Sequence, residues 1–194
     1  MKNGAVPPRS EHGRRSPSRW VRRFVGLIPR TPLAVLDLAC GEGRHVRLLR
    51  AAGHRVVALD RDGAPLRPFA ADDGVEIVVA DLEGGSVWPL ADRRFAGIVV
   101  TNYLHRPLFA AIEGALADGG VLIYETFAAG NERYGRPARA AFLLRPGELL
   151  EVFAARLEVV AYEHGRIAGP SPRVVQRICA AKRGDGGAPP ARIG

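Results

Sequence analysis

The fold of this chain is indicated most clearly by one stretch, Val35-Leu36-Asp37-Leu38-Ala39-Cys40-Gly41-Glu42-Gly43. Its first half is almost continuously apolar, which is typical of a strand buried on both faces of a parallel sheet. Its second half holds two glycines, which allow a tight turn with exposed backbone N–H groups. Apolar residues at helical spacing follow over 44–52, up to a glycine at 53. The stretch therefore predicts a strand, a glycine loop and a helix, which is the repeating unit of an α/β domain.

The same alternation continues along the chain in both composition and spacing. Six further apolar runs predict strands at 55–59, 75–80, 95–101, 121–125, 157–162 and 174–181. Between them, helices are expected at 64–71, where two prolines interrupt the pattern, at 107–116 and at 146–153, with a loop or short helix at 84–92. Strands that alternate with helices predict a twisted, mainly parallel seven-stranded sheet with helices on both faces.

The charge is distributed unevenly along the 194 residues, and this distribution indicates where the folded domain lies. The net charge is +8, and eight of the 28 basic residues but only one acid lie in the first 30 positions. The body is therefore almost neutral, and nucleic acid is possible as a partner but not favoured. We predict a disordered basic tail over 1–17, a single domain over 18–183 and a second disordered tail over 184–194. Two cysteines exclude a disulfide scaffold, and no metal site is expected.

The segment that joins the basic tail to the body has an amphipathic pattern. Trp20, Phe24, Leu27 and Ile28 recur on one face of a short helix, and we expect this face to pack on the main domain. The apolar run after the arginine pair 22–23 ends at Pro29, which is too short for an export signal. No apolar run is long enough to span a membrane, so a cytoplasmic location without membrane association is predicted.

Polar residues follow the predicted parallel strands where each one ends. They are Asp60 after the second strand, Asp81 after the third and Asn102 after the fourth, beside the glycine loop after the first. Ligands of open α/β sheets bind at this edge. The free N–H groups of a glycine loop can hold an anion, and a carboxylate such as Asp60 can accept hydrogen bonds from a ribose diol. The pattern predicts a nucleotide-like ligand.

Two common nucleotide sites fit the sequence poorly. A dinucleotide site requires a third small residue after Gly41 and Gly43, and Val46 stands there instead. The pattern therefore argues against a nicotinamide-dependent dehydrogenase. A phosphate-binding loop of the Walker type requires Gly-Lys-Ser/Thr, which occurs nowhere in the chain.

The residues around these strands resemble the motifs of class I S-adenosylmethionine-dependent methyltransferases. The stretch 35–43 resembles the first motif of that family. The later motifs resemble 57–60, 79–82, 95–102 and 116–123, in the family's order. The resemblance covers about 33–181 and includes small bacterial members of the tellurite-resistance type. It implies a Rossmann-like, doubly wound sheet with the last strand antiparallel, and S-adenosylmethionine as the cofactor. Ala39 stands where many members have a glycine.

The resemblance also implies roles for individual residues. Gly41 and Gly43 would pass the methionine part of the cofactor, with Asp37 near its amino group. Asp60 would hold the ribose, and Asp81 and Leu82 would meet the adenine. Asn102 and Tyr103 would lie beside the sulfonium and face the acceptor. The implied cofactor site is Asp37, Ala39, Gly41, Gly43, Asp60, Arg61, Asp81, Leu82 and Asn102.

Candidates for chemistry at the acceptor follow the fourth strand. Asn102, Tyr103 and His105 are the predicted catalytic residues, although His105 can equally be a partly exposed histidine at the start of the next helix. Glu125 and Tyr134 are further candidate bases. Loop 127–144 is long enough to be functional, and Arg133, Tyr134 and Arg136 are the predicted acceptor-binding residues, with solvated surface arginines as the alternative.

Three functions remain open on this sequence. The first is methyl transfer to a small-molecule acceptor, which the tellurite-resistance-type resemblance favours. The second is methyl transfer to RNA or protein with help from the basic N-terminal arm. The third is a non-catalytic module that binds S-adenosylmethionine, against which the polar set at 102–105 argues. The methyl acceptor and the oligomeric state have no sequence signal.

Overall fold

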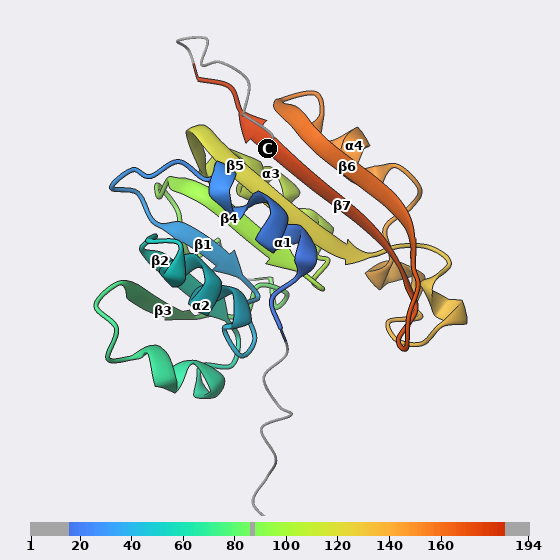
Figure 1. The fold of residues 1–194 in the computed structure, drawn as a ribbon, viewed down its shortest axis with the longest axis horizontal. Coiled ribbons are helices and arrows are strands. Elements are labelled where there is room, and N and C mark those ends of the chain that lie inside the picture. Colours follow the sequence, from blue (N-terminus) through green and yellow to red (C-terminus); the bar gives the residue numbers. More distant parts are fainter. Residues whose placement is uncertain (1–15, 86–87, 185–194) are drawn as a thin grey trace, which may run out of the picture.

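Seven strands form one sheet in the order β3-β2-β1-β4-β5-β7-β6 in the computed structural model, which describes residues 16–85 and 88–184 (Figure 1). Strands β1 to β5 pair in parallel, and β7 runs antiparallel to both of its neighbours. The predicted mainly parallel sheet with an antiparallel last strand is confirmed. The strands are β1 Val35–Leu38, β2 Val56–Asp60, β3 Val75–Val79, β4 Phe95–Thr101, β5 Leu116–Phe127, β6 Leu157–Ile167 and β7 Arg173–Lys182.

Helices cover both faces of this sheet, as predicted (Figure 1). One face packs against α1 and α2, and the other face packs against α3 and α4. The α-helices are α1 Arg19–Phe24, α2 Arg44–Ala51, α3 Phe109–Ala115 and α4 Glu148–Phe153. The 3-10 helices are η2 Val25–Leu27, η3 Ala64–Phe69, η4 Arg106–Leu108, η5 Asn131–Arg133 and η6 Ala140–Phe142.

The apolar pattern of the central strands explains the two cores. All four residues of β1 and all seven residues of β4 are buried. Alternate residues of β4 point to opposite faces, so Ile98 packs with the α3 side and Val99 with the α1 side. An apolar sequence without alternation is what a strand covered on both faces requires.

Several elements differ in extent from the sequence expectation. Strand β6 continues to Ile167 and β7 begins at Arg173, so the last hairpin is longer than the apolar runs suggest. Residues 163–166 are exposed there, and backbone pairing extends the strands where burial does not. Strand β5 begins at Leu116, with an irregularity in its pairing near Phe95. The described part of 84–92 contains turns and no helix.

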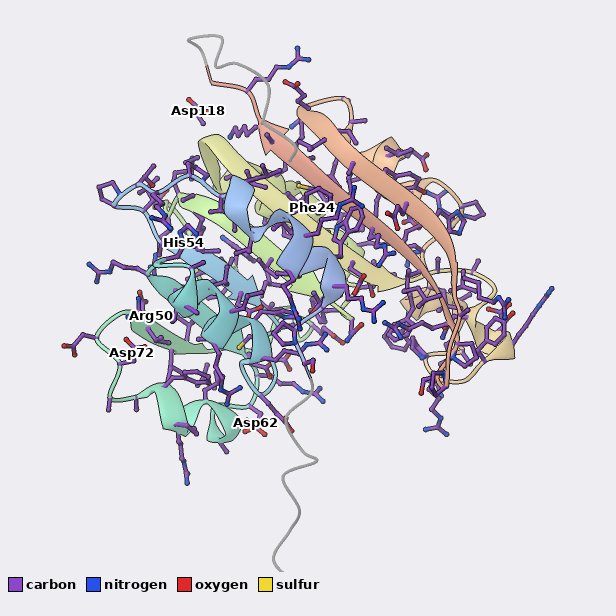
Figure 2. The ribbon with its side chains drawn as sticks, in the orientation of Figure 1. Phe24, Arg50, His54, Asp62, Asp72 and Asp118 are labelled. Carbon is purple, nitrogen blue, oxygen red and sulfur yellow. The ribbon has the colours of Figure 1, made fainter. Side chains whose placement is uncertain are left out.

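The first helix packs on the sheet as its apolar face predicts. Trp20, Phe24 and Ile28 are buried, and the indole nitrogen of Trp20 donates to the carbonyl oxygen of Ile178 at 3.2 Å. On the same face, Arg50 of α2 forms an ion pair with Asp72 at 2.8 Å, which ties α2 to the turn before β3 (Figure 2). These contacts fix both helices beside the glycine loop.

Most of each predicted tail lies outside the described residues, namely 1–15 and 185–194. Ser16 and Pro17, which the sequence assigns to the N-terminal tail, are described. The carbonyl oxygen of Ser16 accepts a hydrogen bond from Arg44 at 3.5 Å. This bond connects the segment before α1 to the start of α2.

Candidate functional site

The loop after β1 has a backbone that ordinary residues rarely adopt. Ala39, Gly41 and Gly43 have φ values of 53°, 55° and 69°. Glycine is favoured in this left-handed region because it lacks a Cβ. A Cβ at Gly43 would collide with the ring of Phe69, whereas a Cβ at Gly41 would meet no atom within 4 Å. Gly43 is therefore needed for packing, while Gly41 presents its backbone to open space.

Asp60 fixes this loop from the end of β2. Its Oδ2 atom accepts a hydrogen bond from the backbone N–H of Gly41 at 2.8 Å, and its Oδ1 atom accepts one from the N–H of Asp62 at 3.1 Å. Parallel pairing of β1 and β2 brings the two strand ends together. The carboxylate is half-buried at the mouth of the loop, where it can also accept hydrogen bonds from a ligand.

Asp37 is the buried acid of this region. It is 1% exposed, and its Oδ2 atom has no hydrogen-bond partner within the described residues. Burial raises the pKa of its carboxyl group to about 8, against a smaller lowering effect from the charge of Arg44. A buried oxygen without a partner is costly, so this position is suited to a cationic or hydrogen-bond-donating ligand group.

Replacing Asp37 with asparagine should change how stability depends on pH. A carboxyl group with a raised pKa binds its proton more tightly in the folded state. Its contribution to stability is therefore lost as the pH rises from about 4 to about 8. Asp37→Asn should remove that loss, so the stability difference between the variant and the wild type should grow by up to about 1.4 kcal/mol per pH unit in this window.

The measurement is urea denaturation of both proteins at pH 5, 6 and 7. His45 titrates with the opposite sign in part of this range, but it is present in both proteins and cancels in the difference. A difference that stays constant with pH would contradict the raised pKa of Asp37.

Three adjoining cavities lie at the carboxyl ends of the parallel strands. The Asp60 cavity, of about 460 Å³, is lined by Ala39, Asp60, Arg61, Asp81, Leu82, Glu83, Tyr103 and Phe142 among others. The Gly41 cavity, of about 310 Å³, is lined by Ala39, Cys40, Gly41, Glu42, Arg44, Thr101 and Asn102. The Arg173 cavity, of about 630 Å³, is lined by Ser16, Pro17, Ser18, Arg19, Arg44, Asn102, Glu125, Phe127, Ile167, Ala168, Arg173 and Arg177.

Shared lining residues show that the three cavities adjoin one another. Ala39 lines both the Asp60 cavity and the Gly41 cavity. Arg44 and Asn102 line both the Gly41 cavity and the Arg173 cavity. Another cavity lies at the opposite edge of the sheet, where the parallel strands begin, and has no such connection. We call this series of adjoining cavities the channel; it lies along the edge of the sheet that the sequence analysis selected.

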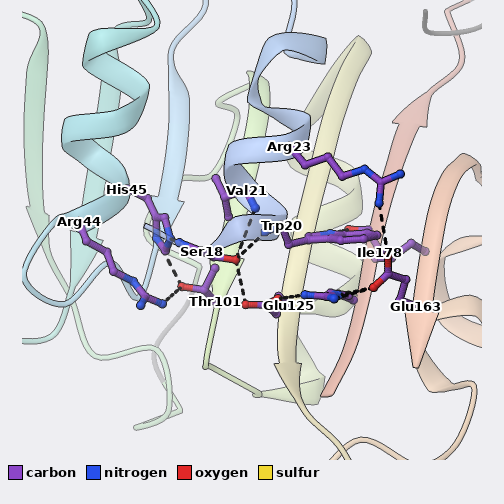
Figure 3. Close-up of polar contacts among 11 residues, drawn as sticks. Ser18, Trp20, Val21, Arg23, Arg44, His45, Thr101, Glu125, Glu163 and Ile178 are labelled. Atoms are coloured by element: carbon purple, nitrogen blue, oxygen red, sulfur yellow. Dashed lines mark hydrogen bonds and ion pairs between the residues drawn. The ribbon is translucent and has the colours of Figure 1, made fainter. Parts of the chain in front are cut away.

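The segment before α1 forms one wall of this channel. Figure 3 shows the polar contacts that hold it there. Ser18 donates its backbone N–H to Nε2 of His45 at 3.0 Å and its hydroxyl to Glu125 at 2.9 Å. Burial, together with the charge of Arg44, lowers the pKa of His45 to about 3, so the ring is neutral near pH 7. The side chain of Arg177 donates to the other oxygen of Glu125 at 3.0 Å. Residues far apart in the chain are thereby held together.

The three predicted catalytic residues separate in the structure. Asn102 has a φ of 56° and lines both the Gly41 cavity and the Arg173 cavity. Tyr103 lines the Asp60 cavity, and burial, followed by the negative charge of Glu83, raises the pKa of its phenol. His105 precedes η4 and lines none of the three cavities. Of the three predicted catalytic residues, only Asn102 lies where two of the cavities adjoin.

Loop 127–144 contributes to the channel through other residues than expected. Asn131 is 1% exposed and bonds to the carbonyl oxygen of Pro137 at 2.9 Å and to the N–H of Val174 at 3.1 Å. This anchoring leaves the predicted acceptor-binding residues exposed and outside the three cavities; they are Arg133, Tyr134 and Arg136. Phe142, from the same loop, lines the Asp60 cavity instead.

The sequence analysis missed the residues that build the Arg173 cavity. Ser18, Arg173 and Arg177 come from the N-terminal segment and from β7, which follow no glycine loop and carry no motif. An arginine at the start of a strand and another four residues later are the only local signal. Two further observations concern the described residues alone. No three His, Cys, Asp or Glu side chains gather there as metal ligands, and none of its helices is both long and apolar enough to cross a membrane.

Comparison with known proteins gives a family match over part of the chain. Residues 35–120 match the family model described as a methyltransferase domain. The matched segment contains the glycine loop after β1 and the strand ends that carry Asp60 and Asn102, and the strand order is that of the Rossmann-like methyltransferase fold. A search of curated proteins gives no match.

Solved structures of low sequence identity share the fold. TehB from Haemophilus influenzae is 17% identical with a TM-score of 0.65, over 79% of this chain and 59% of TehB. A 1,6-didemethyltoxoflavin-N1-methyltransferase from Burkholderia thailandensis is 21% identical with a TM-score of 0.61, over 86% of this chain and 79% of that one. The N-methyltransferase NodS from Bradyrhizobium japonicum is 15% identical with a TM-score of 0.62, over 86% and 95% of the two chains.

Proposed function

We propose that this protein transfers a methyl group from S-adenosylmethionine to a small-molecule acceptor. The adjacency of the three cavities, through the lining residues that they share, carries this proposal. The Asp60 cavity and the Gly41 cavity would hold the cofactor, and the Arg173 cavity would hold the acceptor. Asn102, which lines the last two cavities, would lie at the point of transfer.

The residues of the first two cavities fit the cofactor. Asp37 lines none of the three cavities, but it lies two residues before Ala39 and has a buried oxygen without a partner among the described residues, which an ammonium group would satisfy. Gly41 leaves open space where any side chain would intrude. Asp60 lines its cavity as an acceptor for hydroxyl groups, and Asp81 and Leu82 line the same cavity. Ala39 and Arg61, also predicted to contact the cofactor, line the same cavity.

When bound, S-adenosylmethionine supplies a methyl group on a positively charged sulfur. The protein's own task is to hold the acceptor in line and to receive a proton where the acceptor is an alcohol or an ammonium. Glu125 is the carboxylate of the Arg173 cavity and is better placed for this proton than His105, which lines no cavity. Tyr103, with a raised pKa, keeps its proton and suits a place beside the cofactor.

The size of the Arg173 cavity favours a small acceptor over RNA or protein. Its volume of about 630 Å³ lies within the range of about 300–1,000 Å³ that is usual for small-molecule sites. The segment of Ser16 to Ser18 forms part of the wall of this cavity. Two of the similar structures are named as N-methyltransferases, one of them acting on 1,6-didemethyltoxoflavin, which agrees with this choice. The cytoplasmic location and the domain limits stay predictions.

Calorimetric titration with S-adenosylmethionine, S-adenosylhomocysteine and NAD tests the cofactor assignment. We expect the first two to bind with micromolar dissociation constants and NAD not to bind. Binding of NAD alone would overturn the assignment of the channel.

Deletion of residues 1–15 tests the acceptor class. The deletion keeps Ser16 and Pro17, which line the Arg173 cavity. Methylation of a small acceptor should survive the deletion, because the cavity wall is intact. Methylation that requires RNA or protein, and disappears with residues 1–15, would favour the macromolecular alternative.

A further inference from the structure

The Arg173 cavity has an uneven charge. Its lining contains four arginines, namely Arg19, Arg44, Arg173 and Arg177, and one acid, Glu125. The Asp60 cavity at the other end of the channel has the reverse balance, with Asp60, Asp81 and Glu83 against Arg61. The channel is therefore acidic at one end and basic at the other.

The arginines of the basic end differ in how they are used. Arg177 donates to Glu125 at 3.0 Å and to Glu163 at 2.6 Å, so its charge is balanced by two carboxylates. Arg44 borders the Gly41 cavity as well and donates to Thr101 at 3.3 Å. Within the described residues, Arg173 forms no ion pair with an acid. Of the three cavities, it lines only the Arg173 cavity.

The setting of Arg173 suits a ligand rather than solvent. It is the first residue of β7, opposite Ile167 in β6, and it is partly buried. Apolar side chains of Phe127, Ile167 and Ala168 line the same cavity. A guanidinium beside an apolar wall can bind a carboxylate or phosphate with paired hydrogen bonds while the wall takes an apolar body.

We propose that the acceptor is an organic anion whose carboxylate or phosphate group binds Arg173 at the basic end of the channel. This inference rests on the proposed function, because it names the substrate class of the same site. Arg173 would be a specificity-determining residue, and Arg177 would serve mainly to hold Glu125 in place. The anionic group would bind Arg173, and the rest of the acceptor would extend toward Asn102, which also lines the Gly41 cavity.

Benzoate, phenyl phosphate and the neutral benzamide are suitable probes. They share an aromatic body and differ in charge. Each is titrated by calorimetry into the full chain, saturated with S-adenosylhomocysteine. We expect at least one of the two anions to bind at least about tenfold more tightly than benzamide, since hydrogen bonds to charged groups contribute about twice as much as neutral ones. The tighter anion identifies the head group.

Two variants locate the effect. Arg173→Gln should weaken binding of the preferred anion about tenfold or more and leave benzamide and S-adenosylhomocysteine unchanged. Arg166→Gln removes the same charge from the exposed part of the same hairpin, outside the cavity, and should change anion binding less than about twofold. Equal affinity for all three probes, or anion binding that Arg173→Gln leaves intact, would overturn the inference.

Failure of the inference is distinguishable from failure of the proposed function. If S-adenosylhomocysteine binds and the anions show no preference, the cofactor assignment stands and the organic-anion acceptor is wrong. If S-adenosylhomocysteine does not bind the wild type, the same probes titrated without it still test Arg173. Anion binding that depends on Arg173 would then support an anion site in a protein whose proposed function is wrong.

Discussion

Replacing Asp60 with alanine is expected to reduce the affinity for S-adenosylhomocysteine about 100-fold or more. Each hydrogen bond from a ribose hydroxyl to a carboxylate contributes about 1.5–3 kcal/mol, and 1.4 kcal/mol corresponds to tenfold. Alanine would also free the N–H of Gly41, which donates to Asp60 at 2.8 Å, and so loosen the glycine loop. Both effects lower the affinity for the cofactor, and neither one removes a buried apolar contact.

Asp62 offers a matched control two residues away. Its carboxylate accepts from the N–H of Ala64 at 2.9 Å and lines none of the three cavities. Asp62→Ala should lower stability slightly, by about 0.5–2 kcal/mol, and leave the affinity within about twofold. Calorimetry and thermal unfolding of both variants give the comparison. An Asp60→Ala protein that binds as tightly as the Asp62→Ala protein would remove the ribose role from Asp60.

A valine at Gly41 should abolish cofactor binding by filling the space in front of the loop. A Cβ at this position would meet no atom within 4 Å, and Gly41 lines the Gly41 cavity. The side chain of a valine would therefore occupy space in front of the loop. The positive φ of 55° adds backbone strain, which costs about 1–2 kcal/mol for residues other than glycine. The expected result is a folded but less stable protein with no measurable affinity for S-adenosylhomocysteine.

Gly53→Val separates the steric effect from this strain. Gly53 ends α2 with a φ of 88°, and a Cβ there also meets nothing within 4 Å, but the residue lines none of the three cavities. The two variants should lose similar stability, and only Gly41→Val should lose binding. Equal affinities in the two proteins would mean that the cofactor does not pass over Gly41.

The part of the candidate site that lies at the ends of the parallel strands was predictable from the sequence, because its residues follow one simple rule. Each of Asp37, Asp60 and Asn102 is in or directly after an apolar run, and parallel strands end at the same edge of the sheet. The same rule selected Ala39 and the glycines. For these residues, position in the local pattern was enough to predict position in space.

The rest of the site depends on contacts that no local pattern encodes. Arg133 and Arg136 were predicted at the acceptor, but Asn131 anchors their loop with both side chains exposed. Arg173 reaches the channel because an antiparallel hairpin extends beyond the apolar runs of its strands. Ser18 reaches it because α1 packs across the sheet. These placements follow from tertiary packing, which single-sequence reasoning does not supply.

The position of α1 sets an order of assembly for the site. Ser18 bonds to Glu125, which lies 107 residues away, and Trp20 bonds to Ile178, which lies 158 residues away. Contacts of such long separation form late, since a long chain must close before they are made. A nascent chain on the ribosome that has emerged only as far as β5 has the glycine loop and Asp60, yet lacks Arg173 and the strand on which Trp20 rests. The residues proposed to hold the cofactor are therefore all present before synthesis is complete, while the Arg173 cavity requires the last strand.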